Sequence, residues 1–202
     1  PKLMVSDRAH AIMPYHIVLD GVLSGHQGSL AAGSTRRGIA PVYADKMYRN
    51  GIRMIDLLEP EIFSEKLDKG YGFAKGIIEK LFGEKLHITQ NEIFDSYCNF
   101  GQKLKPYITD TALELYNAHK KGESILFEGA QGISLDVDHG IYPYTTSSNT
   151  AAGHISTGTG VSFRDINRII GVVKAYLSRV GEGPLPSEIN GDSAHALREK
   201  GN

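Results

Sequence analysis

Hydrophobic positions along the chain follow two different periods, and the change between them divides the sequence. From Pro60 to about Lys121 apolar residues recur every three to four positions, which predicts helices. Ser124–Gly132 and Arg168–Gly181 instead contain short continuous apolar runs that end in glycine-rich turns, which is typical of buried parallel strands. The pattern predicts an α/β fold in which a helical block at residues 60–121 is inserted among the strands.

Within the helical block, three helices are predicted from their boundaries. Pro60 suits the first turn of one helix, because proline lacks the backbone N–H that a first turn leaves unpaired. Asn91 is of a type that caps a second helix, which ends before Pro106. Thr109 or Asp110 begins the third. Glycines within the first helix predict an interruption, at Gly70, Gly72 and Gly76.

The segments before the helical block carry a weaker pattern. Lys2–Ser6 is a short apolar run that predicts a buried strand, and His16–Gly25 predicts a short helix weakened by glycine. Gly33–Pro41 is rich in glycine, serine and arginine, which is typical of a loop. Because ligands of α/β proteins usually bind beyond the carboxyl ends of parallel strands, the turns after Ser124–Gly132 and Arg168–Gly181 are the first candidates for a site.

Composition limits the kinds of partner. The chain has 202 residues, a length that one larger α/β domain can occupy, so we predict a single domain over residues 1–202. Lysine plus arginine (22) nearly balances aspartate plus glutamate (23), so no overall positive field favours nucleic acid or an acidic membrane. The single cysteine, Cys98, excludes a disulfide framework and fits a reducing cytoplasm. No apolar run approaches the roughly 20 residues that span a bilayer, and the first residues show no signal-peptide pattern.

Two polar segments follow the first predicted strand of the second half. Thr145–Gly153 (TTSSNTAAG) concentrates hydroxyl groups that suit a polar ligand or phosphate oxygens, although the same composition is also typical of a plain loop. Asp136, Asp138 and His139 are residue types that bind divalent metals. The alternative, which we favour, is a turn in which the aspartates accept hydrogen bonds from their own backbone.

A third polar segment is basic. Ser34–Gly38 (STRRG) is followed by Asp45, Lys46 and Arg49, and planar guanidinium groups match the geometry of phosphate oxygens. A monophosphate site and a solvated basic surface both fit this pattern. The sequence contains no Gly-Lys pair and hence no Walker loop, so a nucleoside triphosphate would be held elsewhere. No nucleophilic triad is present in a recognisable motif.

Three segments resemble, in order, those of the adenylosuccinate synthetase family: GSTRRGIAPVYADKMYRNGIRMIDLL, ILFEGAQGISLDVDHGIYPYTTSSNTAAG and KAYLSRVGEGPLPSE. The resemblance covers most of the chain and is weaker in the first 30 residues and the helical block. It implies part of a mainly parallel, P-loop-NTPase-like sheet in a cytoplasmic homodimer. The family joins IMP and L-aspartate, using GTP and Mg²⁺ to phosphorylate the purine 6-oxygen before the aspartate amine displaces the phosphate.

The resemblance also implies roles for individual residues. Thr35 and Arg49 match positions that bind the IMP 5′-phosphate, and Arg49 matches an arginine that reaches into the neighbouring subunit's site. Gln131 and Thr146 match positions that contact IMP, with Gln131 near the 6-oxygen, where it would stabilise developing negative charge. Val180 matches a backbone or ribose contact.

Parts of the family pattern are not present in this sequence. The segments GDEGKGK and GHT, which carry the family's general base, its general acid and a magnesium ligand, are missing, as are RRTGW and the guanine-reading TKxD. Arg36 also stands where a glycine is expected, and arginine rarely adopts the positive φ that glycine allows.

We therefore expect a central portion of the enzyme that is inactive in isolation. The alternatives are a noncatalytic nucleotide-binding or oligomerisation module derived from it, and a metal-dependent hydrolase built on the Asp136 turn.

Overall fold

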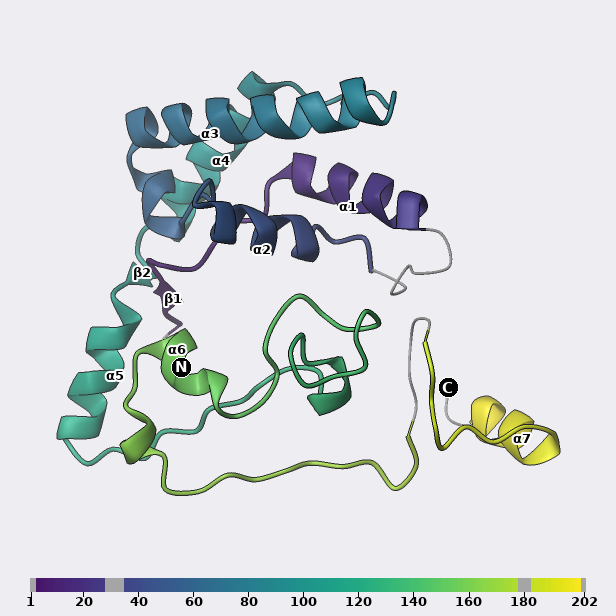
Figure 1. Cartoon of the computed structure of the whole chain (residues 1–202). Coiled ribbons are helices and arrows are strands. Elements are labelled where there is room, and N and C mark those ends of the chain that lie inside the picture. Colours follow the sequence, from purple (N-terminus) through teal and green to yellow (C-terminus); the bar gives the residue numbers. More distant parts are fainter. Residues whose placement is uncertain (1–2, 28–34, 178–182, 201–202) are drawn as a thin grey trace.

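A computed structural model describes residues 3–27, 35–177 and 183–200 (Figure 1). Its first strand, β1 (Val5–Ser6), pairs in parallel with β2 (Ile108–Thr109). The remaining elements are helical and follow in this order: α1 (Pro14–Gln27), α2 (Ile39–Tyr48), the 3₁₀ turn η2 (Met54–Leu58), α3 (Pro60–Lys75), the π-helical η3 (Gly76–Leu81), α4 (Gln90–Leu104), α5 (Thr111–Lys120), η4 (Ile133–Leu135), α6 (His154–Thr159), η5 (Phe163–Asp165) and α7 (Asp192–Lys200).

The hydrophobic core lies among α1, α3 and α4. Met13, Phe63 and Ile93 are fully buried there, and the Phe63 ring stacks on Phe94 with centroids 5.5 Å apart. Stacked rings of this kind add to the free energy gained from burial alone. The core thus sits in the N-terminal half of the chain, in the upper part of Figure 1, where it supports α1 and α2.

Helix α3 runs without a break through Gly70 and Gly72, so the predicted interruption there is wrong. The reason at Gly70 is packing, because a β-carbon at this position would lie 2.6 Å from the Tyr15 hydroxyl oxygen. Burial of neighbouring side chains outweighs the weak helix propensity of glycine. The regular α-helix gives way to η3 only at Gly76, the third predicted glycine.

Two helix boundaries also differ from the predictions. Helix α2 begins at Ile39, inside the segment that was predicted to be a loop to Pro41, and a proline is tolerated so close to a helix start. Helix α4 is capped by Thr89 rather than Asn91: the Glu92 N–H donates to Thr89 Oγ1, and the Glu92 carboxylate accepts from the Thr89 N–H. This reciprocal pair satisfies two unpaired donors and fixes the helix start.

The α/β class is confirmed, but with a two-stranded parallel sheet among the described residues. The strands predicted at Ser124–Gly132 and, as far as Leu177, at Arg168–Gly181 form no strand or ladder in the structure. Leu126 is 84% exposed and Val172 is 96% exposed. A strand needs a neighbour to pair with its backbone groups, and Figure 1 shows the segment after α6 running by itself, so the apolar runs acquire no partner within the described part of the chain.

An ion pair joins the segment just after β1 to the start of α5. The Arg8 guanidinium donates to both carboxylate oxygens of Asp110, at 2.8 and 3.1 Å, and Asp110 caps α5 by accepting from the Leu113 N–H. The hydrogen bond from Arg8, followed by the bond from Leu113, holds the pKa of Asp110 at about 2. Within the described residues, no helix is both long enough and apolar enough to cross a membrane.

Candidate functional site

Helix α2 separates the two residues that were predicted to bind phosphate. Thr35 is exposed just before the helix, and Arg49 is exposed immediately after it, where its backbone is left-handed with φ 67°. A helix of 10 residues is roughly 15 Å long at about 1.5 Å per residue. The structure therefore does not bring Thr35 and Arg49 of one chain together.

The C-terminal end of α2 is attached to α1 by a buried polar pair. The Nε2 atom of His16 lies 2.9 Å from Oδ2 of Asp45, and both side chains are buried. The Met13 N–H donates to Nδ1 of His16 at 2.9 Å, so Nδ1 must be an acceptor. The proton of the neutral ring is then on Nε2, from which it is donated to Asp45.

The N-terminal end of α2 is attached to α1 by a second buried carboxylate. Oδ2 of Asp20 accepts from the Gly38 N–H at 2.9 Å. Gly38 has φ 80°, and a β-carbon there would lie 3.0 Å from the His16 side chain. Glycine is thus required at Gly38 by both its conformation and its close packing.

Arg36 adopts the conformation that the glycine of the expected pattern would adopt freely. Its φ is 53°. Arg36 lies between the exposed Thr35 and the start of α2. For a residue with a side chain, the left-handed conformation costs about 1–2 kcal/mol. The loop that carries Thr35 is therefore strained at the position where a glycine was expected.

Replacing Arg36 by glycine is expected to stabilise the chain by about 0.5–1 kcal/mol, because the relieved strain exceeds the added entropy of glycine in the unfolded chain. Urea unfolding would measure the change. Arg37→Gly is the matched control, since Arg37 has no positive φ and its replacement should destabilise. Equal shifts in the same direction for both variants would contradict the strain.

One buried carboxylate, that of Asp136, organises the loop that follows the apolar run at Ser124–Gly132. Its Oδ1 accepts from the N–H groups of Asp138 and His139, at 2.9 and 3.0 Å. Its Oδ2 accepts from the N–H groups of Thr150 and Ala151, at 2.6 and 3.2 Å. Asp136 therefore holds the Asp138–His139 turn against Thr150 and Ala151.

These bonds decide between the two interpretations of the Asp136 turn. Desolvation favours the neutral acid, but the backbone donors outweigh it and hold the pKa of Asp136 well below its ordinary value. Both oxygens are occupied by backbone N–H groups, as the favoured interpretation predicted. Among the described residues no group of three His, Cys, Asp or Glu side chains could hold a metal ion, so the metal-hydrolase alternative is wrong for this turn.

Gln131 and Thr146 lie on the same loop. Gln131 is exposed and left-handed, with φ 63°, directly after the apolar run. Thr146 is half-buried, and its N–H donates to the Leu135 carbonyl at 2.9 Å, so its backbone is fixed beside η4. Their two positions are thus set by backbone conformation rather than by a rigid helix or strand.

The second glycine-rich turn lies against this loop. Gly183 has φ 102°, and a β-carbon there would lie 2.7 Å from Cβ and 2.8 Å from Cδ2 of Tyr144. Glycine thus allows two turns, far apart in the sequence, to pack on each other. Val180 lies outside the described residues.

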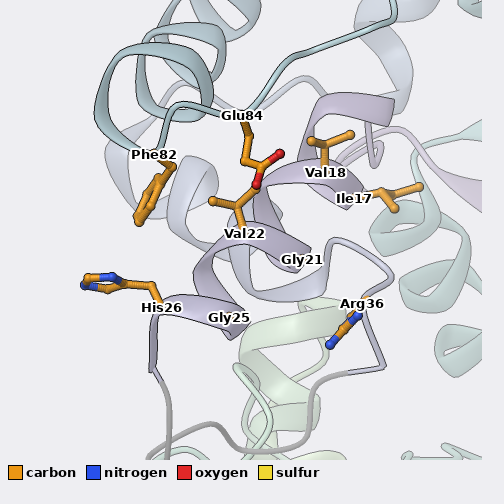
Figure 2. Close-up of a pocket in the computed structure, with 9 residues that line it drawn as sticks. All are labelled: Ile17, Val18, Gly21, Val22, Gly25, His26, Arg36, Phe82 and Glu84. Atoms are coloured by element: carbon orange, nitrogen blue, oxygen red, sulfur yellow. The ribbon is translucent and has the colours of Figure 1, made fainter.

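A hollow of about 590 Å³ lies beside α1, with Arg36 as part of its lining. Its walls come mainly from one face of α1, and Figure 2 shows Arg36 on the opposite side from Phe82 and His26. Thr35, Arg49, Gln131 and Thr146 do not line it. The hollow is therefore separate from the four described residues that were predicted to bind IMP.

The family model for adenylosuccinate synthetase matches residues 1–202. The chain belongs to the adenylosuccinate synthetase family. It is 47% identical over 200 residues to the enzyme of Clostridium acetobutylicum, covering 99% of this chain and 46% of the relative. It is 49% identical over 199 residues to that of Geobacter sulfurreducens, covering 98% of this chain and 46% of the relative.

A solved adenylosuccinate synthetase from Plasmodium falciparum, described as fully ligated, has the same fold. The TM-score is 0.90 at 33% identity, over 98% of this chain and 46% of that one. The chain thus spans about 46% of the length of the curated relatives named above. The resemblance read from the three sequence segments is confirmed.

Strained backbone coincides with the predicted synthetase positions. Among the described residues, the non-glycine residues with positive φ are Arg36, Arg49 and Gln131. Two of them were predicted to bind IMP, and the third adjoins Thr35. Such conformations persist only where the surroundings impose them, and they cluster at functional sites.

Other important residues were not found from the sequence. His16 and Asp20 are buried polar residues of α1, and their only sequence signal is a polar type within an otherwise apolar helix. Gly183 was noted only as part of a glycine-rich turn. Their roles depend on partners 18 or more residues away, which spacing alone does not reveal.

Proposed function

We propose that this chain supplies the IMP-binding part of an adenylosuccinate synthetase, a ligase of purine biosynthesis that joins IMP and L-aspartate with GTP and Mg²⁺. The observation that carries the proposal is the left-handed backbone at Arg36, Arg49 and Gln131 in a chain of this family. Strain at the residues matched to the substrate supports a binding role. A chain with one cysteine also fits a reducing cytoplasm.

Gln131 is proposed to act at the purine 6-oxygen. It is exposed, and its backbone is left-handed. An amide that donates to an oxygen on which negative charge develops stabilises the transition state more than the ground state. Thr146, half-buried on the same loop, is proposed to contact IMP beside it, and Val180 to make a backbone or ribose contact.

Thr35 and Arg49 are proposed to bind the 5′-phosphate of two different IMP molecules. Because α2 holds them apart, Arg49 would complete the site of a second subunit. Met47 and Tyr48, which precede Arg49, are 67% and 61% exposed, and the Tyr48 ring lies 6.4 Å from that of the exposed Phe73. An exposed apolar patch beside a projecting arginine supports a homodimer in which the patch is covered.

GTP and Mg²⁺ are assigned to no residue of this chain. The sequence has no Gly-Lys pair for a Walker loop, and the Asp136 carboxylate is occupied by backbone donors. The family's acid–base segments GDEGKGK and GHT are also missing from this sequence. We therefore expect the 202-residue chain to bind IMP but not to form adenylosuccinate by itself.

Calorimetry with IMP tests the proposal. Arg49→Ala is expected to weaken IMP binding about 10- to 100-fold, the effect of losing a charge-assisted hydrogen bond to phosphate. Arg164→Ala, which removes another exposed arginine, from η5, should leave the affinity unchanged.

Sedimentation of the same samples gives the subunit state. In dimeric samples, equal affinity of the unmodified chain and Arg49→Ala would contradict the role of Arg49. A chain that stays monomeric while it binds IMP would contradict the shared site.

A further inference from the structure

Helix α1 contacts both ends of α2 through side chains one helical turn apart. His16 bonds to Asp45 near the C-terminal end of α2, and Asp20 bonds to Gly38 at the N-terminal end. Residues four apart lie on the same face of a helix. One face of α1 therefore carries two buried polar groups that face the two ends of a single neighbouring helix.

We propose that His16, Asp45 and Asp20 are positioning residues for the substrate-phosphate ligands: the His16–Asp45 pair sets Arg49, and Asp20 sets Thr35. The inference rests on the proposed function of Thr35 and Arg49. None of the three positioning residues is assigned a contact with substrate, so they act through the two exposed residues.

Asp45 connects the buried pair to Arg49 through its own backbone. The Asp45 carbonyl accepts from the N–H groups of Asn50 and Gly51, at 2.9 and 3.1 Å. These two bonds close the turn in which Arg49 is left-handed. Because the Asp45 side chain is held by His16, the carbonyl that closes the turn is held as well.

The ring of His16 is oriented from both sides. Met13 donates to Nδ1, so only the Nε2–H tautomer is compatible with the bond to Asp45. A buried pair of this kind is poor evidence of stability, because apolar side chains of similar volume often stabilise a fold as well. Its specific effect is to fix the direction and depth of Asp45 relative to α1.

Asp20 acts on the N-terminal end of α2 by a direct bond to its cap residue. Its carboxylate accepts from the N–H of Gly38, which is the cap residue of α2 and lies three residues after Thr35. Arg36, between them, is held at a positive φ. A fixed Gly38 is one of the constraints under which an arginine remains in that conformation.

Amide hydrogen exchange on the 202-residue chain tests the two links separately. Asp45→Ala is expected to raise the exchange rates of Asn50 and Gly51 at least about tenfold and to leave Gly38 unchanged. Asp20→Ala is expected to do the reverse. Asp45→Asn, which keeps an acceptor oxygen for the His16 Nε2–H, should restore most of the protection at Asn50 and Gly51.

Tyr71→Phe is the matched control, because it removes a part-buried hydrogen bond to the Ile88 carbonyl, 2.9 Å long, in which no residue of α2 takes part. Tyr71→Phe should leave the amide exchange rates at both ends of α2 unchanged. If both the Asp45 and the Asp20 variants accelerate amide exchange equally at the two ends of α2, each substitution acts by destabilising the whole fold. That result would overturn the inference. No acceleration in either variant would overturn it as well.

A double-mutant cycle with IMP connects the links to binding. Asp45→Ala should weaken IMP binding less than Arg49→Ala, and the double variant should bind no more weakly than Arg49→Ala, within about twofold. Additive losses would overturn the inference, because Asp45 would then act independently of Arg49. If Arg49→Ala has no effect, or if IMP does not bind, the proposed function fails, while the exchange rates still decide whether the links position α2.

Discussion

Asp136→Ala is expected to release the loop that carries Thr146 and to weaken IMP binding by about 100-fold, because four part-buried backbone hydrogen bonds lose their acceptor together. In the native chain the donors of those bonds are the N–H groups of Asp138, His139, Thr150 and Ala151. Calorimetry measures the affinity, and amide exchange at the four donors should accelerate at least about tenfold.

The neighbouring Asp138 provides the control for this loop. Its carboxylate is exposed and accepts from the Asn149 side chain at 2.5 Å, so Asp138→Asn leaves the backbone bonds of the loop in place. It should bind IMP nearly as well as the unmodified chain. If Asp136→Ala binds IMP as tightly as Asp138→Asn, the loop does not need its central carboxylate to hold the ligand.

Gly101→Ala is expected to destabilise the chain by about 2 kcal/mol, the usual effect of overpacking a core. Gly101 is buried on α4, and a β-carbon there would overlap the Leu57 carbonyl oxygen and lie 3.1 Å from Leu57 Cβ. The carbonyl belongs to the backbone of η2 and cannot move aside as a flexible side chain can. The midpoint of urea unfolding measures the change.

Gly72→Ala tests the same substitution where there is room. Gly72 lies on α3, and a β-carbon there would have no neighbour within 4 Å. Alanine should therefore stabilise the helix by about 1 kcal/mol. A destabilisation shared by both variants would show that glycine acts through chain flexibility and not through the contact with Leu57.

The helices could be predicted because local pattern and burial agree in them. Helices α1, α3, α4 and α5 were all expected from apolar spacing and boundary residues. The strands predicted at Ser124–Gly132 and at Arg168–Gly181, the latter as far as the described Leu177, failed as ladders for a physical reason. A helix pairs its backbone internally, whereas a strand depends on a neighbour that its own sequence does not encode.

The candidate site was likewise predicted only in part. Its residue types could be identified from the motifs, but the departure from an expected glycine at Arg36 did not decide the conformation, which has φ 53°. The left-handed backbone of Arg49 and Gln131 could not be predicted, because neither is a type that favours it. The His16–Asp45 pair was also missed, since it joins residues 29 apart and depends on how α1 and α2 pack.

The placement of Thr35 and Arg49 at opposite ends of α2 has a genetic consequence. If each site takes Thr35 from one chain and Arg49 from the other, Thr35→Ala and Arg49→Ala damage different halves of the shared site. In a mixed dimer, one site combines the two intact residues and the other collects both defects. Two alleles that each fail alone would then complement one another when both are expressed in the same cell.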